Sequence, residues 1–244
     1  METFNTLEQV INFYKTDNPD KNKIIYQTFE KNVKSIPILE KQHDDTPGFG
    51  ELSFSWSWFL LVKSMPQDFT FLEIGVYKGR VLALIQLLSN LFNKHVKIHG
   101  VTPLDGAATD KYSEYQDCDY LTAIKNSYNI CKTSFKNTNI IHGYSQEKDI
   151  IKKTKDLGPF NMVFIDGCHD YDIVVQDIKN YSEMLIENGY LILDDASLYI
   201  TNPYGTFLGH PDVGKAIQDI IDKDPCFVQL YAIGHNRIWQ KISI

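Results

Sequence analysis

From about residue 69 the chain alternates short apolar runs with helical patterns, and this alternation constrains its fold more than any other feature. Apolar side chains recur at helical spacing over 81–92 and over 174–185, where Asn188-Gly189 is expected to end the helix. Strands with two apolar faces that alternate with helices predict a parallel sheet covered on both sides. The predicted strands are 69–74, 96–101, 138–142, 161–165, 190–193, 227–233 and 238–244.

The last two predicted strands are separated by only the four residues 234–237. A connection this short makes an antiparallel hairpin. With a crossover helix expected near 212–223, the pattern describes an α/β protein with a doubly wound, seven-stranded, mostly parallel sheet that ends in an antiparallel β-hairpin. The dinucleotide-binding fold ends differently.

Residues 1–65 have a different pattern and are expected to form an N-terminal helical extension, leaving 66–244 as the catalytic domain. The expected helices are 5–15, 21–34 and 52–64. The aromatic residues Phe54, Trp56, Trp58 and Phe59 are expected to pack this extension on the sheet or on a second subunit. The extension is therefore a candidate cap over the active site or a candidate homo-oligomer interface.

The chain is acidic, with 24 Lys and Arg residues against 31 Asp and Glu residues and a formal net charge of −7. This balance argues against general binding to nucleic acid or to anionic membranes. The apolar stretch 58–62 is too short to span a membrane, and no secretory signal is visible. The four cysteines suit neither a zinc knuckle nor a disulfide scaffold, so we expect reduced thiols in a cytoplasmic protein.

The first predicted strand runs into the turn Glu73-x-Gly75-x-x-x-Gly79. The two glycines allow a tight turn and a close approach to a ligand, although an ordinary strand-to-helix turn is the alternative. The dinucleotide fingerprint Gly-x-Gly-x-x-Gly is missing, and Glu73 would repel a phosphate. A carboxylate at this position suits a cationic ligand such as S-adenosylmethionine.

Together with the motifs below, this turn resembles the class I S-adenosylmethionine-dependent methyltransferases over about residues 69–240. Within that class the chain resembles the metal-dependent O-methyltransferases, namely catechol O-methyltransferase and, more closely, the family that methylates sugar hydroxyls on macrolides and glycans. The resemblance implies a Rossmann-like sheet and adenine-side contacts from Ser145 and Gln146, in a segment that could also be a polar loop. Thr102 stands where the family usually has an acidic ribose ligand, and Asp105 is the candidate to replace that ligand.

Three carboxylates follow the fourth and fifth predicted strands: Asp166, Asp194 and Asp195. Neighbouring strands would bring them within about 5 Å, where they repel one another unless a cation lies between them. Oxygen ligands favour Mg²⁺, with Mn²⁺ or Ca²⁺ also open, whereas simple capping of loops and helices is the structural alternative. The resemblance aligns all three with the family's metal ligands and also places Asp166 among the cofactor-binding and catalytic residues.

His169 lies three residues after Asp166, where the resemblance implies a catalytic base: lysine in the catechol enzyme and histidine in the sugar enzymes. Imidazole accepts a proton near neutral pH and commonly serves as a base. We therefore expect metal-assisted deprotonation of the acceptor by His169, followed by in-line transfer of the methyl group.

Two long connections are candidates for contact with the acceptor. The first is 102–119, and the second follows the fifth strand and contains Tyr199, Tyr204, Phe207 and His210. Aromatic and polar residues suit a carbohydrate, and equally a wet surface loop. The segments Tyr112-x-x-Tyr115, 207–213 and 234–238 are similar to methyltransferase domains that accompany glycan-building enzymes, which favours a sugar.

The sequence therefore predicts a methyltransferase that uses S-adenosylmethionine and a divalent metal to methylate a sugar hydroxyl of a glycan or glycosylated metabolite, as in polysaccharide biosynthesis. An N-methyltransferase and a small-phenol or catechol O-methyltransferase stay open as alternatives. From other classes, a non-catalytic methyltransferase-like module and an NAD(P)-dependent oxidoreductase are weaker alternatives. The expected partners are a small molecule or glycan, with no nucleic acid and no membrane span.

Overall fold

The structure is a computed structural model that describes residues 3–105, 110–112 and 118–243. Within these residues the strands form one seven-stranded sheet in the order β3-β2-β1-β4-β5-β7-β6. Neighbours from β3 to β5 pair in parallel, and β7 pairs antiparallel with β5 and with β6. This topology confirms the predicted fold class. The strands are β1 (Asp68–Ile74), β2 (His95–Thr102), β3 (Thr138–His142), β4 (Phe160–Ile165), β5 (Leu185–Leu193), β6 (Phe227–Ile233) and β7 (Asn236–Lys241).

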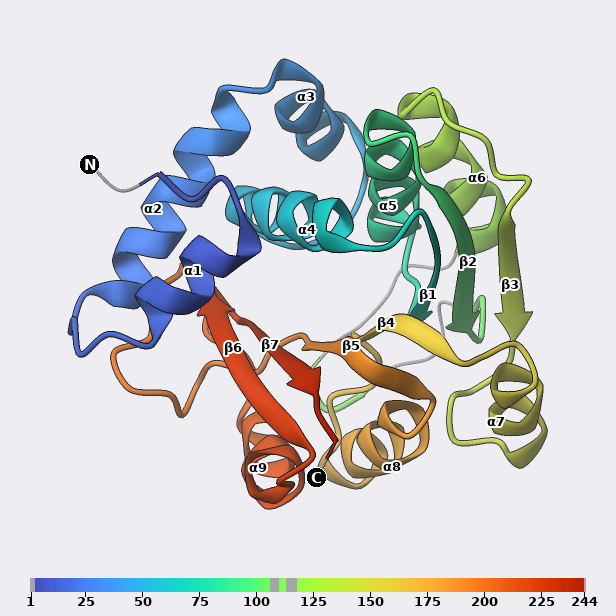
Figure 1. Cartoon of the computed structure of the whole chain (residues 1–244). Coiled ribbons are helices and arrows are strands. Elements are labelled where there is room, and N and C mark those ends of the chain that lie inside the picture. The colour runs from blue at the N-terminus through green and yellow to red at the C-terminus, as the bar shows by residue number, and fades with distance from the viewer. Residues whose placement is uncertain (1–2, 106–109, 113–117, 244) are drawn as a thin grey trace.

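Helices cover both faces of the sheet, with α4 and α5 on one face and α8 and α9 on the other (Figure 1). Helices α1 to α3 lie on the α4 side, and α3 was not predicted. None of the described helices is both long and apolar enough to cross a membrane. The helices are α1 (Leu7–Tyr14), α2 (Lys21–Lys34), α3 (Pro37–Asp45), α4 (Leu52–Ser64), α5 (Arg80–Leu91), α6 (Tyr120–Ile130), α7 (Lys148–Lys155), α8 (Tyr171–Ser182) and α9 (Pro211–Asp219).

The apolar residues of the central strands contribute to two hydrophobic cores, one on each side of the sheet. In β1, Phe71 belongs to the core beneath α4 and α5, whereas Leu72 belongs to the core beneath α8 and α9. In β4, Phe164 and Val163 alternate in the same way. Because successive side chains of a strand point to opposite faces, a strand buried on both sides is mostly apolar.

The predicted helix stop at Asn188-Gly189 is wrong. Helix α8 ends at Ser182, and β5 begins at Leu185 and continues through Gly189. Asn188 has a left-handed backbone (φ 62°), and the pairing with β4 shifts register between Phe160 and Met162. The Asn-Gly pair therefore accommodates an irregularity inside a strand, a conformation that asparagine and glycine adopt more readily than other residues.

Two other predicted boundaries also differ from the structure. The expected helix 212–223 divides into α9 and a 3₁₀ turn at Ile221–Lys223. The last strand, expected over 238–244, begins at Asn236 and ends at Lys241, and residue 244 lies outside the described residues. All four cysteines are described and are free thiols.

The aromatic residues of α4 pack on the sheet. The Trp58 ring meets Phe71 of β1 and Phe164 of β4 edge-on, at centroid distances of 5.9 and 5.2 Å. Trp56 and Phe59 stack on each other at 4.4 Å. The N-terminal extension thus contributes to the same core as the central strands.

We predict that Trp58→Ala lowers the free energy of unfolding by about 3–5 kcal/mol, because it opens a cavity between α4 and the sheet. The measurement is chemical denaturation followed by circular dichroism. Ile38→Ala, at a side chain that is 48% exposed in α3, is the control and should change stability by less than about 0.5 kcal/mol. Equal losses in the two variants would contradict the packing described for α4.

Candidate active site

The turn after β1 presses against the end of β4. Gly75 has a φ of +94°, and a Cβ atom there would lie 1.9 Å from the carbonyl oxygen of Asp166. Gly79 has a φ of +77° and precedes the first residue of α5. Both positions need the left-handed backbone that glycine adopts without strain. The turn therefore brings the backbone of β1 close to the first predicted metal ligand.

A cavity of about 320 Å³ opens at the carboxyl ends of β1 to β4. This is where ligands bind in open α/β sheets, and its size suits a small organic molecule. Val76, Tyr77 and Ile173 supply apolar walls. Six of the predicted site residues also line it: Gly75, Thr102, Asp105, Ser145, Gln146 and Asp166.

Hydrogen bonds hold the loops that carry these residues. The Tyr181 hydroxyl donates to the carbonyl oxygen of Ser145 at 2.6 Å. The amide of Gly143 donates to the carbonyl oxygen of Thr102 at 3.0 Å, joining the ends of β2 and β3. The wall expected to face an adenine is therefore positioned by the fold before any ligand binds.

Glu73 and Gly79 do not line the cavity. Glu73 is buried in β1, and its Oε2 atom has no hydrogen-bond partner among the described residues. Burial, with a contribution from the charge of Asp194, raises the pKa of Glu73 to about 8. Its contact with a cationic cofactor stays a prediction, and the geometry gives Gly79 a role in the turn.

The three aspartates converge at the ends of β4 and β5, as expected for neighbouring parallel strands. Asp166, Asp194 and Asp195 line one small pocket there. Burial and the charges of Asp194 and Asp195 raise the pKa of Asp166 well above its usual range. Burial also raises the pKa of Asp194 to about 6, although the nearby His235 opposes this shift. Buried carboxylates that repel one another in this way fit a bound cation.

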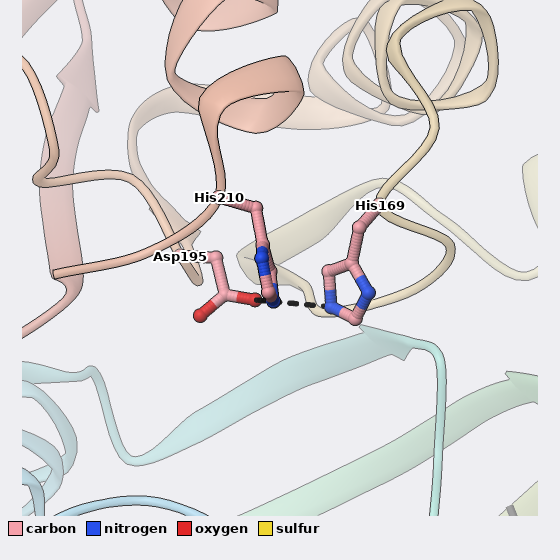
Figure 2. A group of neighbouring side chains, drawn as sticks. All are labelled: His169, Asp195 and His210. Atoms are coloured by element: carbon pink, nitrogen blue, oxygen red, sulfur yellow. Dashed lines mark ion pairs between the residues drawn. The ribbon is translucent and has the colours of Figure 1, made fainter. Parts of the chain in front are cut away.

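Two imidazoles face the carboxylate of Asp195 (Figure 2). Nε2 of His169 lies 3.0 Å from Oδ2 of Asp195, and Nε2 of His210 lies 3.5 Å from the same oxygen. Burial lowers the pKa of His210. For His169, burial also acts to lower the pKa, but the hydrogen bond and charge of Asp195 outweigh it and raise the pKa.

Asp110 holds His169 from the other side and was not predicted. Its Oδ2 atom lies 2.7 Å from Nδ1 of His169 and accepts a hydrogen bond from the backbone amide of His169 at 2.9 Å. Asp110 belongs to the connection 102–119, which was predicted to be a binding loop. Nothing in the sequence of that loop pointed to Asp110 itself. Residues 106–109 and 113–117 of that connection, with Tyr115 among them, lie outside the described residues.

His235 was also missed by the sequence reasoning. It lies in the turn between β6 and β7, and its Nε2 atom is 3.4 Å from Oδ1 of Asp194. The pairing of Leu193 with Arg237 places this turn beside the end of β5. The sequence predicted the hairpin that carries His235. The strand register that brings His235 to the aspartates is visible only in the structure.

The predicted acceptor residues separate into two pairs. Phe207 packs against His210 at a centroid distance of 5.1 Å, so both border the aspartates. Tyr204 packs instead against Tyr26 of α2 at 5.2 Å. Tyr199 is half-exposed beside α9. The structure therefore brings only Phe207 and His210 of these four residues to the candidate site.

The sheet order, the glycine turn and the cavity at the strand ends define a class I methyltransferase fold. The sequence profile of a methyltransferase-domain family matches residues 72–196, just over half of the chain. The chain belongs to this family. The match spans the turn after β1, the cavity loops and all three aspartates.

Three similar proteins illustrate how far the likeness extends. Uncharacterized protein R132 of Acanthamoeba polyphaga mimivirus is 27% identical over 157 residues, which cover 63% of this chain and 61% of that protein. The chain thus spans about three fifths of the length of this relative. The calicheamicin methyltransferase CalS11 has a TM-score of 0.58 at 15% identity, covering 94% of this chain and 96% of its own. MycE of the mycinamycin pathway has a TM-score of 0.54 at 15% identity, covering 84% and 54%. At these identities the two structures share the fold.

We predict that Glu73→Gln becomes more stabilising as pH rises. Because folding raises the pKa of Glu73 to about 8, its contribution to stability is fully present below the unfolded pKa and is lost as pH rises toward about 8. The free energy of unfolding of the variant, relative to the wild type, should therefore grow between about pH 5 and about pH 8, approaching a few kcal/mol.

Chemical denaturation in chelator across this pH range measures the effect. Glu187→Gln makes the same change at an exposed position of β5 and is the matched control. A pH-independent difference between Glu73→Gln and the wild type would contradict a buried, protonated Glu73.

Proposed function

We propose that this chain uses S-adenosylmethionine to methylate a sugar hydroxyl in a glycan or glycosylated metabolite, with a divalent cation at the aspartates. The observation that carries the proposal is the position of Asp166. The same residue lines the cavity and, with Asp194 and Asp195, a small pocket at the carboxylate cluster. A cofactor in the cavity and an acceptor at the cluster would therefore meet at one point.

The cavity residues fit S-adenosylmethionine, which would supply an electrophilic methyl group. Ser145 and Gln146 would contact the adenine side. Thr102 and Asp105 would lie on the ribose side, with Asp105 supplying the carboxylate that Thr102 cannot. The apolar wall of Val76 and Ile173 would exclude water from the bound molecule.

The carboxylates Asp166, Asp194 and Asp195 fit a divalent cation because they line one small pocket and carry like charge. Such an ion, Mg²⁺ or alternatively Mn²⁺ or Ca²⁺, would lower the pKa of an acceptor hydroxyl bound to it. The aspartates would also fix the direction of that hydroxyl relative to the cavity.

His169 would accept the acceptor proton at Nε2, which lies 3.0 Å from Oδ2 of Asp195. Asp110 engages Nδ1 at 2.7 Å, which orients the ring and leaves Nε2 facing the aspartates. A carboxylate on one imidazole nitrogen fixes the tautomer of the ring and favours proton uptake at the other nitrogen. Asp110 therefore acts as a positioning residue for the proposed base.

A sugar acceptor is supported by the aromatic border of the site and by two of the similar folds. The Tyr112 ring stacks on His210 at 4.4 Å, beside Phe207. CalS11 is described as a TDP-rhamnose 3'-O-methyltransferase, and MycE was crystallised with Mg, SAH and mycinamycin VI. Planar rings with polar neighbours suit the apolar faces and hydroxyls of a sugar.

We also propose that residues 1–65 support the acceptor side of a catalytic domain formed by 66–244. Oε1 of Glu51 accepts a hydrogen bond from the backbone amide of Thr206 at 2.6 Å. The Asn22 side chain donates to the carbonyl oxygen of Asn202 at 2.7 Å. These contacts hold the loop that carries Phe207 and His210.

We expect His169→Gln to lower the rate of methyl transfer about 10²- to 10⁴-fold, because the acceptor proton loses its base. Binding of S-adenosylhomocysteine should change little. The measurement is transfer of a labelled methyl group to a panel of nucleotide sugars and glycans, with product mass spectrometry. His95→Gln, at an exposed histidine on the opposite end of the sheet, is the control and should retain the wild-type rate.

The same assay with a chelator tests whether the reaction needs a divalent cation. Full activity in the chelator would contradict that part of the proposal. Methylation of a phenol or an amine, with no sugar methylated, would favour the alternative acceptors. A wild-type rate for His169→Gln near neutral pH would remove His169 from the base role.

A further inference from the structure

His235 is buried against the carboxylate cluster and has no role in the function proposed above. It is 7% exposed, and its Nε2 atom lies 3.4 Å from Oδ1 of Asp194. Its Nδ1 atom is buried and has no hydrogen-bond partner among the described residues. The nitrogen that faces the carboxylates is therefore Nε2, and it is the atom of this ring that can reach an ion at the cluster.

The surroundings of His235 fix its ring beside the aspartates. Phe54 of α4 meets the ring edge-on at a centroid distance of 4.6 Å, and Phe207 lies at 5.3 Å. The backbone carbonyl of His235 accepts a hydrogen bond from Ala196 at 2.7 Å, which ties the hairpin turn to the segment after β5. The imidazole is therefore held by packing on one side and faces carboxylates on the other.

Asp194, Asp195 and His235 each offer one ligand atom, and these atoms lie within 4.8 Å of one another. This spacing allows one ion to contact all three. Carboxylate oxygens alone suit Mg²⁺ or Ca²⁺, whereas an added imidazole nitrogen shifts the preference toward transition ions such as Mn²⁺, Co²⁺ or Zn²⁺.

A second group of comparable spacing, His169, Asp195 and His210, is less suited to an ion. Both ring nitrogens of His169 already face carboxylates, Asp110 at 2.7 Å and Asp195 at 3.0 Å. An ion on His169 would also occupy the nitrogen that the proposed base needs. Nε2 of His235 faces Asp194 at 3.4 Å, and an ion bound there leaves Nε2 of His169 to its proposed role as base.

We propose that His235 is a direct ligand of the divalent ion, together with Asp194 and Asp195. The site is then a mixed nitrogen and oxygen site that binds divalent transition ions, Mn²⁺ included, more tightly than Mg²⁺. This inference rests on the proposed function for the presence of an ion, and it adds both a ligand and a metal class.

Pulsed electron paramagnetic resonance of the full chain loaded with Mn²⁺ tests the inference. A coordinated imidazole nitrogen should give nitrogen modulations in the wild type, and uniform ¹⁵N-histidine labelling should change them. His235→Gln should abolish the modulations and lower Mn²⁺ affinity at least about tenfold, with a smaller effect on Mg²⁺. His210→Gln, the matched variant in the other group, should keep them.

Bound Mn²⁺ without nitrogen modulations in the wild type would overturn the proposal, whether or not the variant folds. Modulations that survive in His235→Gln, or that disappear in His210→Gln, would also overturn it. Methyl transfer measured on the same wild-type sample separates the two claims. Methyl transfer without nitrogen modulations would support the proposed function and reject His235 as a ligand. Nitrogen modulations without methyl transfer would support His235 as a ligand and reject the proposed function.

Discussion

The parallel pairing of β1, β4 and β5 brings acidic side chains to one buried edge of the sheet, and the candidate site depends on their repulsion. The charge of Asp194 contributes to raising the pKa of both Glu73 and Asp166. Without a cation, burial favours protonated forms of these carboxyls, which raises their pKa values. The fold thus brings together carboxylates whose mutual repulsion a bound cation would reduce. They lie next to a cavity of suitable size for a nucleoside cofactor.

The elements around this edge converge from distant parts of the sequence. The glycine turn after β1 allows the close approach to Asp166, and the β6–β7 hairpin brings His235 to Asp194. The connection after β2 supplies Asp110 to His169. The N-terminal extension reaches the same region through Phe54, which packs on His235. The sheet and the N-terminal residues therefore meet at the candidate site.

The sequence predicted much of this because its strongest signals are local. Apolar runs identified the strands, and their parallel order placed Asp166 beside Asp194. The features that the sequence did not predict depend on contacts between residues that are far apart in the chain. Asn188-Gly189 is a common helix stop, but here it bends within a strand. Asp110 and His235 carry no motif, because their roles arise from a loop path and a strand register. Tyr204 was predicted to contact the acceptor, but its ring packs on Tyr26 instead.

The cavity at the carboxyl ends of β1 to β4 is the proposed binding site of the cofactor. Hydrogen exchange with and without S-adenosylhomocysteine tests it directly. Backbone amides in 74–77, 102–105, 143–146 and 166–168 should become protected, with little change around Pro19 and Asn202, which are hydrogen-bonded to each other outside the cavity. Absence of protection in these four segments, or protection confined to other parts of the chain, would contradict it.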